Sequence, residues 1–212
     1  MRLVTGLTIG MIASAVVTDL LAQAEPSGSP PRLTGNSFAV ARYKGGSSAS
    51  LYVASHVGAV MFVAGGVHQP RNNLKTMVLG VGTRVQFSRS SAVTVIAAGG
   101  SSPKGESVRL FALPRVMAGH VAVAGIAATY LPVNGKAPRQ AMVDPLTISA
   151  PVIGGLRGGL SAMVTTTERS RPDFGLGPSA QLRVPGGALA VELLTRTTSS
   201  RPQFRCSFSA AL

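Results

Sequence analysis

Three histidines and a single cysteine are the side chains of this chain with the widest chemical repertoire: His56, His68, His120 and Cys206. Nucleophilic catalysis would need a serine or cysteine beside a histidine, with a third group to orient that histidine. A metal site would need His or Cys ligands at short, regular spacings. These four residues are scattered along the chain and follow neither pattern. We therefore expect no catalytic residue, no metal site and no bound cofactor.

Several arginines have a more informative spacing, because they alternate with apolar neighbours. Alternate residues of a β-strand point to opposite faces, so these arginines would share the polar face of a sheet. With one nearby acid the set consists of Arg84, Arg183, Glu192, Arg196 and Arg205. Two interpretations remain open. The set is either a hydrogen-bonded cluster that satisfies its own buried charge or a positive lining that favours anions.

The elements that would position these residues are strands of about ten residues. In 74–87, Met77, Leu79 and Val81 share one face, whereas Gly80 and Arg84 share the other. Similar stretches recur along the chain, at 37–44, 48–56, 59–68, 74–87, 92–99, 106–117, 120–131, 140–152, 156–168, 173–184, 188–198 and 203–212. One apolar and one polar face is the pattern of a membrane barrel wall, with the apolar face toward lipid.

The connections between these strands alternate in length. Short ones lie at 56–58, 88–91, 118–120, 154–155 and 185–187, and longer, polar ones at 44–48, 68–73, 99–106, 132–139, 168–173 and 197–202. Short turns at one end and longer loops at the other are typical of outer-membrane barrels. Prolines inside strands, such as Pro145 and Pro151, each remove a ladder hydrogen bond and predict bulges or breaks.

The last strand carries a resemblance to a known class of protein. In residues 203–212, Phe204, Cys206 and Phe208 point one way, and Arg205 and Ser207 point the other. This strand resembles the C-terminal assembly signal of bacterial outer-membrane β-barrels, although that family usually ends in Phe and this chain ends in Leu. The resemblance implies an all-β, antiparallel up-and-down transmembrane β-barrel of about 12 strands, with 8–12 as the range. It also implies the barrel-assembly machinery as a partner and the outer membrane as the location.

The N-terminus supports export. Arg2 precedes an apolar run at 3–17, and Ala22-Gln23-Ala24 offers small residues for a signal peptidase. We expect residues 1–24 to be a signal peptide cleaved after Ala24. An uncleaved anchor is the alternative, but Asp19 leaves the run short of the roughly 20 residues that a spanning helix needs. Residues 25–36 read as a flexible leader rich in Pro, Gly and Ser, and residues 37–212 as the barrel domain.

The charge balance limits the classes of partner that the chain is expected to bind. The chain has 20 Lys and Arg against 7 acids, a net charge of +13, yet only 13% of its residues are charged. A basic balance often indicates nucleic acid, which the export signal argues against. Contact with outer-membrane lipids, in particular lipopolysaccharide phosphates, is the interpretation that fits loop cations. These cations are Arg71, Lys104, Lys136, Arg139, Arg169 and Arg171.

The expected function is a structural barrel or a narrow porin-like channel that favours anions. One alternative is a lipid-modifying outer-membrane enzyme, in which Glu106, Glu168 or Asp173 would orient His68. The sequence around His68 does not resemble the His-x-Ser-Asn motif of outer-membrane phospholipases or lipid A deacylases. The other alternative is a soluble secreted or periplasmic β-sandwich that binds a ligand, against which the alternating connection lengths argue.

Overall fold

Antiparallel strands make up the computed structural model, which describes residues 37–45, 48–70, 73–134, 138–168 and 170–211. The expected signal peptide and leader therefore lie outside the described residues. The strands are β1 (Ser37–Lys44), β2 (Ser48–Val57), β3 (Val60–Gln69), β4 (Leu74–Ser88), β5 (Ser91–Ser102), β6 (Gly105–Ala118), β7 (Val121–Pro132), β8 (Gln140–Ile153), β9 (Leu156–Thr167), β10 (Ser170–Val184), β11 (Gly187–Arg196) and β12 (Ser199–Ala211). Within the described residues, no helix is long and apolar enough to cross a membrane.

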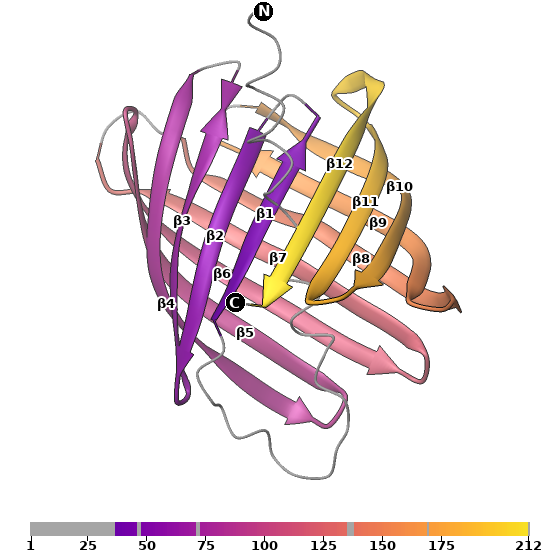
Figure 1. Ribbon diagram of the computed structural model, residues 1–212. Coiled ribbons are helices and arrows are strands. Elements are labelled where there is room, and N and C mark those ends of the chain that lie inside the picture. Colours follow the sequence, from indigo (N-terminus) through magenta and orange to yellow (C-terminus); the bar gives the residue numbers. More distant parts are fainter. Residues whose placement is uncertain (1–36, 46–47, 71–72, 135–137, 169, 212) are drawn as a thin grey trace, which may run out of the picture.

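The twelve strands close into one barrel (Figure 1). Each strand pairs with its sequence neighbours, and β1 pairs with β12 through a register that includes Tyr43 opposite Cys206. The predicted antiparallel up-and-down barrel is confirmed. The β-sandwich alternative is wrong, because a single closed sheet has no second sheet to pack against.

We call the end of the barrel that is uppermost in Figure 1 the upper rim, and the opposite end the lower rim. The upper rim carries Gly45, Asn73 and Lys104, and the lower rim carries Gly58 and Gly119. The expected difference in connection length is smaller than predicted. At the upper rim only Pro103 and Lys104 separate β5 from β6, because the ladder continues up to the pair Ser102–Gly105.

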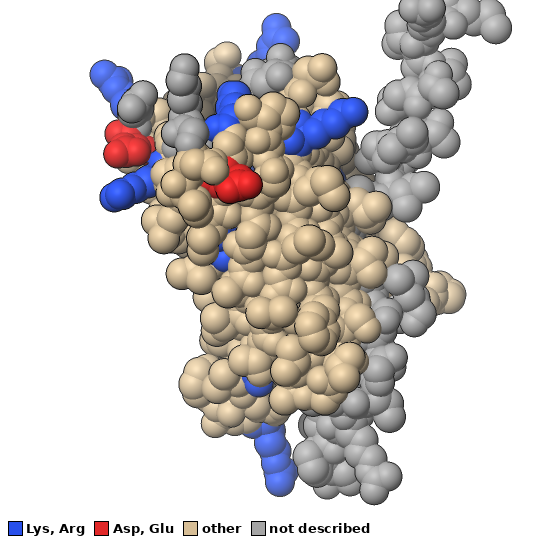
Figure 2. Space-filling view, turned by 90° about the vertical axis from the view of Figure 1, so that its left-hand side faces the viewer, with Lys and Arg blue, Asp and Glu red and all other residues tan. Residues whose placement is uncertain are grey.

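The outside of the barrel is apolar, as the strand pattern predicts. Met77, Leu79 and Val81 of β4 are all exposed, whereas Val78 between them is buried on the lumen side. Figure 2 shows a broad band almost without charge, with Lys, Arg, Asp and Glu gathered toward the upper rim. In water such a band would be unfavourable, but against lipid tails it is the stable arrangement.

The interior prolines have the expected effect at two positions in β8. The β8–β9 register shifts between Val143 and Leu146, around Pro145, and again between Pro151 and Ile153. Proline cannot donate to the ladder, so one extra residue is accommodated at each point. The bulge at Pro145 changes which later β8 side chains face the lumen, whereas Gln140, Met142 and Asp144 face it in ordinary alternation.

Candidate functional site

A cavity of about 740 Å³ lies inside the barrel. Its lining includes Lys104 and Pro138 at the upper rim and Gly154 and Arg183 at the lower rim. Because the same cavity reaches both ends of the strands, the lumen is the candidate functional site.

Positive charge dominates this lumen. Eight Lys and Arg side chains line the cavity against two carboxylates. The cations are Arg42, Lys44, Arg84, Lys104, Arg109, Arg115, Arg157 and Arg183, and the acids are Asp144 and Glu192. In a narrow, partly desolvated lumen these charges are screened less than charges on an open surface. The lining therefore carries a net positive charge.

Asp144 of β8 is the centre of an ion-pair network that crosses the lumen. Its carboxylate accepts a hydrogen bond from Lys44 Nζ at 2.5 Å and another from Arg205 Nη1. Arg42 Nη2 lies 3.4 Å from Asp144 Oδ1. Lys44 and Arg42 belong to β1 and Arg205 to β12, far from β8 in the strand order. We call these four residues the transluminal bridge.

Glu192 of β11 extends the bridge on the β12 side. Glu192 Oε2 lies 3.5 Å from Arg205 Nη1 and 3.6 Å from Arg42 Nη2. Ser161 of β9 donates a hydrogen bond to Glu192 Oε1 at 2.9 Å. Arg205 also donates to Gln203 Oε1 at 3.0 Å, and its side chain is only 2% exposed. Each buried charge of the bridge therefore has an opposite charge within reach, which lowers the cost of its burial.

The register around Glu192 differs from the expected one. A turn at Gly186-Gly187 predicts Gln181 opposite Glu192, whereas Ser179 lies opposite Glu192 and Val184 pairs with Gly187. The turn residues are Pro185 and Gly186, and Gly186 has a φ of 74°. Proline followed by glycine with positive φ is typical of a type II turn, which explains the shift.

The five residues predicted as one lumen cluster lie in separate places. Glu192 and Arg205 are together in the extended bridge. Arg196 is near the upper rim, where it pairs with Asp173. Arg84 and Arg183 line the cavity elsewhere, and Arg84 Nε is buried without a hydrogen-bond partner.

The sequence analysis missed several lumen residues. Arg42 and Lys44 of β1, Arg109 and Arg115 of β6, and Asp144 of β8 all line the cavity. The period of two could have found the first four, because they alternate with outward neighbours such as Val108 and Leu110. The same period could have found Asp144, because Gln140, Met142 and Asp144 all line the cavity and the alternation of β8 changes only at the Pro145 bulge.

Apolar and aromatic side chains also line the lumen. Ala54, Met61, Ile96 and Leu113 form a buried cluster, against which Tyr52, Val63, Phe111 and Ile126 pack. Phe111 meets Tyr130 edge to face, with ring centroids 6.0 Å apart. Arg109 lies over the Tyr130 ring, with its Cζ 5.0 Å from the centroid. The lumen thus combines charged, aromatic and aliphatic side chains.

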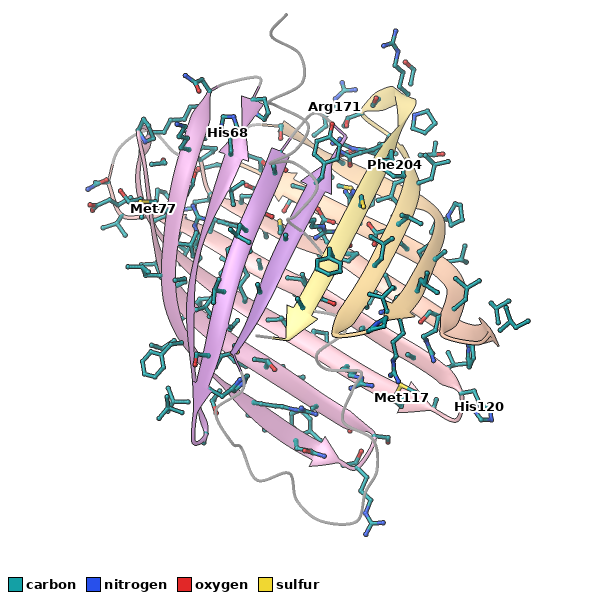
Figure 3. All side chains as sticks on the ribbon, viewed as in Figure 1. His68, Met77, Met117, His120, Arg171 and Phe204 are labelled. Atoms are coloured by element: carbon teal, nitrogen blue, oxygen red, sulfur yellow. The ribbon has the colours of Figure 1, made fainter. Side chains whose placement is uncertain are left out.

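The histidines do not assemble a catalytic set. His68 is exposed at the upper rim and His120 at the lower rim (Figure 3), whereas His56 lines the cavity. The carboxylates that could orient His68 have other partners. Glu106 accepts from Asn134 Nδ2 at 2.9 Å, and Asp173 pairs with Arg196. In the part of the chain that the structure describes, no His, Cys, Asp and Glu residues gather as a metal site would require.

Three of the six cations expected to contact lipid phosphates can be placed. Lys104 lines the upper mouth of the cavity. Arg139 and Arg171 are exposed, and Figure 3 shows Arg171 at the upper rim. Arg71, Lys136 and Arg169 lie outside the described residues.

Comparison with known proteins identifies the fold. No protein-family model matches the chain, and no match is found among functionally characterised sequences. Among solved structures, the KdgM porin is similar with a TM-score of 0.59 and 8% identity, over 84% of this chain and 99% of that chain. KdgM in complex with disordered oligogalacturonate gives 0.60 and 8% over the same shares. The NanC porin gives 0.56 and 5%, over 83% of this chain and 98% of that chain.

These likenesses confirm the sequence-based prediction of a porin-like outer-membrane barrel at the level of the fold. The two porins are matched over nearly their whole length, so the likeness concerns the complete barrel and not a shared hairpin. The apolar band of Figure 2 agrees with a barrel wall that faces lipid.

Proposed function

We propose that this protein is an outer-membrane channel that passes small anions. The observation that carries the proposal is the lumen itself, a cavity that reaches both rims and is lined by eight cations against two carboxylates. Rings of Lys and Arg in a pore favour anions, because they replace part of the hydration that an entering anion loses. The lumen cations also account for part of the high net positive charge of the chain.

Two cations of the lower half illustrate the preference. Arg84 of β4 and Arg115 of β6 flank β5, where their strand partners are Thr94 and Ala92. Asp144 and Glu192, the two acids that line the cavity, already have cations of the bridge as ion-pair partners. An anion that passes the bridge therefore meets further positive charge toward the lower rim.

One comparison supports an anionic substrate. The KdgM porin is known in complex with oligogalacturonate, which is a polyanion. A twelve-stranded barrel of this kind can therefore accommodate an acidic solute. Sequence identity of 8% carries no particular substrate over to this chain, so the proposal stays at the level of anions.

A sealed structural barrel is the second candidate. The transluminal bridge and the buried cluster of Ala54, Met61, Ile96 and Leu113 occupy part of the lumen. A barrel filled by its own side chains would carry no current. An enzyme is the weaker candidate, because Glu106 and Asp173 are engaged away from His68.

The partners follow from the location. We include in the proposal that Arg139 and Arg171 of the upper rim contact lipopolysaccharide phosphates, and that the barrel-assembly machinery recognises the β12 strand. Exposed guanidinium groups suit phosphate oxygens through charge-assisted hydrogen bonds. Replacement of both arginines by Glu should lower the amount of lipopolysaccharide that co-purifies with the barrel, and unchanged co-purification would remove this part of the proposal.

The channel can be tested by chloride efflux from liposomes that contain the purified, folded protein. With valinomycin present to carry potassium, we expect efflux well above that of empty liposomes. Arg84→Glu should slow the efflux, because it places a negative charge on the lumen wall. The matched control is Arg89→Glu, since Arg89 is exposed in the turn between β4 and β5 and does not line the cavity. Efflux equal to that of empty liposomes would favour the sealed barrel.

A further inference from the structure

We propose that the lumen wall around Arg109 is a binding site for an organic carboxylate with a flat apolar body, such as an aromatic carboxylate. The inference rests on the proposed channel function and names the class of solute that the channel would prefer. The observations that carry it are a pre-positioned guanidinium, its lack of an ion-pair partner among the described residues and an adjoining aromatic wall.

Arg109 is held in one position by three neighbours. Its Nε donates a hydrogen bond to Ser107 Oγ at 3.1 Å. Its guanidinium lies over the ring of Tyr130. On β5, Gly100 leaves the space that the guanidinium fills, because a Cβ at that position would lie 2.7 Å from Arg109 Cζ. A cation that is already ordered loses little conformational freedom when it binds an anion.

The charge of Arg109 is not neutralised by these contacts. Ser107 and Tyr130 are neutral, and no carboxylate of the described residues is paired with Arg109. Arg42, Lys44 and Arg205 differ, because each is within ion-pair distance of Asp144. Arg109 is 9% exposed and faces the cavity, so its positive charge is partly desolvated. Such a charge favours a carboxylate more strongly than an exposed arginine does.

An apolar surface adjoins this cation. Phe111 packs edge to face on Tyr130 and, like Tyr52, also packs against the buried cluster around Met61. Gly65 of β3 leaves room for Tyr52, since a Cβ there would lie 2.9 Å from Tyr52 Cγ. Porin lumens are typically polar, so aromatic rings and aliphatic side chains beside a buried arginine are unexpected there. Contact with an apolar solute would explain these side chains.

The combination of a buried guanidinium and an apolar surface should discriminate between anions. A carboxylate can accept hydrogen bonds from the guanidinium while its apolar body covers Phe111 and Tyr52, which gains hydrophobic and ring-stacking energy. A chloride ion gains only the electrostatic part. A polyhydroxy acid would bury hydroxyl groups against apolar side chains and lose their hydrogen bonds to water. The site should therefore favour benzoate over gluconate at equal charge.

The test is the reversal potential of bilayer currents carried by benzoate, acetate or gluconate against chloride. In water acetate is smaller than benzoate, so a passive pore without a site passes acetate faster. We expect the opposite order here, with benzoate at least as permeant as acetate and about tenfold more permeant than gluconate. Arg109→Gln should lower the benzoate-to-chloride permeability ratio about tenfold, as the loss of a charged hydrogen bond to the carboxylate implies.

Two further variants keep the test independent of folding. Gly100→Ala should shift the Arg109 side chain and lower the same ratio, whereas Arg89→Gln, in the exposed turn between β4 and β5, should leave it unchanged. Each variant is checked for a heat-dependent shift in gel migration, which shows a folded barrel. If chloride passes but benzoate is less permeant than acetate, the Arg109 site is overturned and the channel stands. If no ion passes, the proposed function itself fails.

Discussion

Lys44 of β1 donates a hydrogen bond of 2.5 Å to Asp144 of β8, although β12, β11, β10 and β9 lie between the two strands around the wall. A contact of this kind crosses the lumen, so it ties together nearly opposite sides of the barrel. It joins strands that share no backbone hydrogen bond. The bridge therefore contributes both to the rigidity of the barrel and to the width of the passage.

Removal of the central acid should destabilise the barrel. Asp144→Asn removes the carboxylate that accepts hydrogen bonds from Lys44 and Arg205, and breaking a buried ion pair typically costs about 3 kcal/mol or more. We expect a lower midpoint in a heat-modifiability series, in which the folded and unfolded bands are separated on a gel. Asp173→Asn is the matched control, because Asp173 pairs with the more exposed Arg196 and should cost less. Equal midpoints for the two variants would contradict a stabilising bridge.

Lys44 and Asp144 should be energetically coupled. In a double-mutant cycle with Lys44→Met and Asp144→Asn, the double variant should be less destabilised than the sum of the two single variants. The expected interaction energy is about 1–3 kcal/mol, as for residues in one ion-pair network. Urea titration in detergent micelles measures the free energies of unfolding. Additive effects would mean that the two side chains do not interact across the lumen.

Closure of the barrel can be tested through the single native cysteine. Tyr43 lies opposite Cys206 in the β1–β12 register, and directly opposed side chains are close enough for a disulfide. Tyr43→Cys should therefore form an intramolecular crosslink on mild oxidation, visible as faster migration of the boiled, non-reduced protein.

The control for closure is Ala39→Cys, which lies four residues earlier on β1 and roughly 13 Å away along the strand. It should not crosslink to Cys206. Crosslinking of Ala39→Cys but not of Tyr43→Cys would place the β1–β12 seam in a different register.

The outer face should tolerate charge only near the rims. Val81 is in the middle of β4 and 50% exposed, and Phe87 is near the lower rim and 69% exposed. In lipid, Val81→Arg should cost about 2–4 kcal/mol, and Phe87→Arg should cost about 0–1 kcal/mol. Unfolding in lipid vesicles measures both. A larger cost at Phe87 than at Val81 would show that the apolar band does not mark the membrane core.

The strands could be predicted because their signal is local. Met77, Leu79 and Val81 alternate with Val78 and Gly80, and one buried face repeated at period two requires a sheet whatever its partners are. Once adjacent strands join through short connections, an up-and-down barrel follows. The strands of the barrel wall can therefore be predicted from residue spacing alone.

The bridge could not be predicted, because it depends on the closed shape. Asp144 meets Lys44 only after β1 has paired with β12, because closure of the sheet brings β8 across the lumen from β1. The partner of Glu192 was also missed, and here the cause is a local one. The choice between turns at Pro185-Gly186 and Gly186-Gly187 moves its opposite residue from Gln181 to Ser179.

The reversal potential of the barrel in a planar bilayer under a KCl gradient tests the central claim most directly. The lumen carries eight cations against two acids, so we predict a measurable current whose reversal potential lies toward the chloride equilibrium potential. Arg84→Glu should move it toward zero. A reversal potential on the potassium side, or a folded barrel that passes no current, would contradict an anion channel.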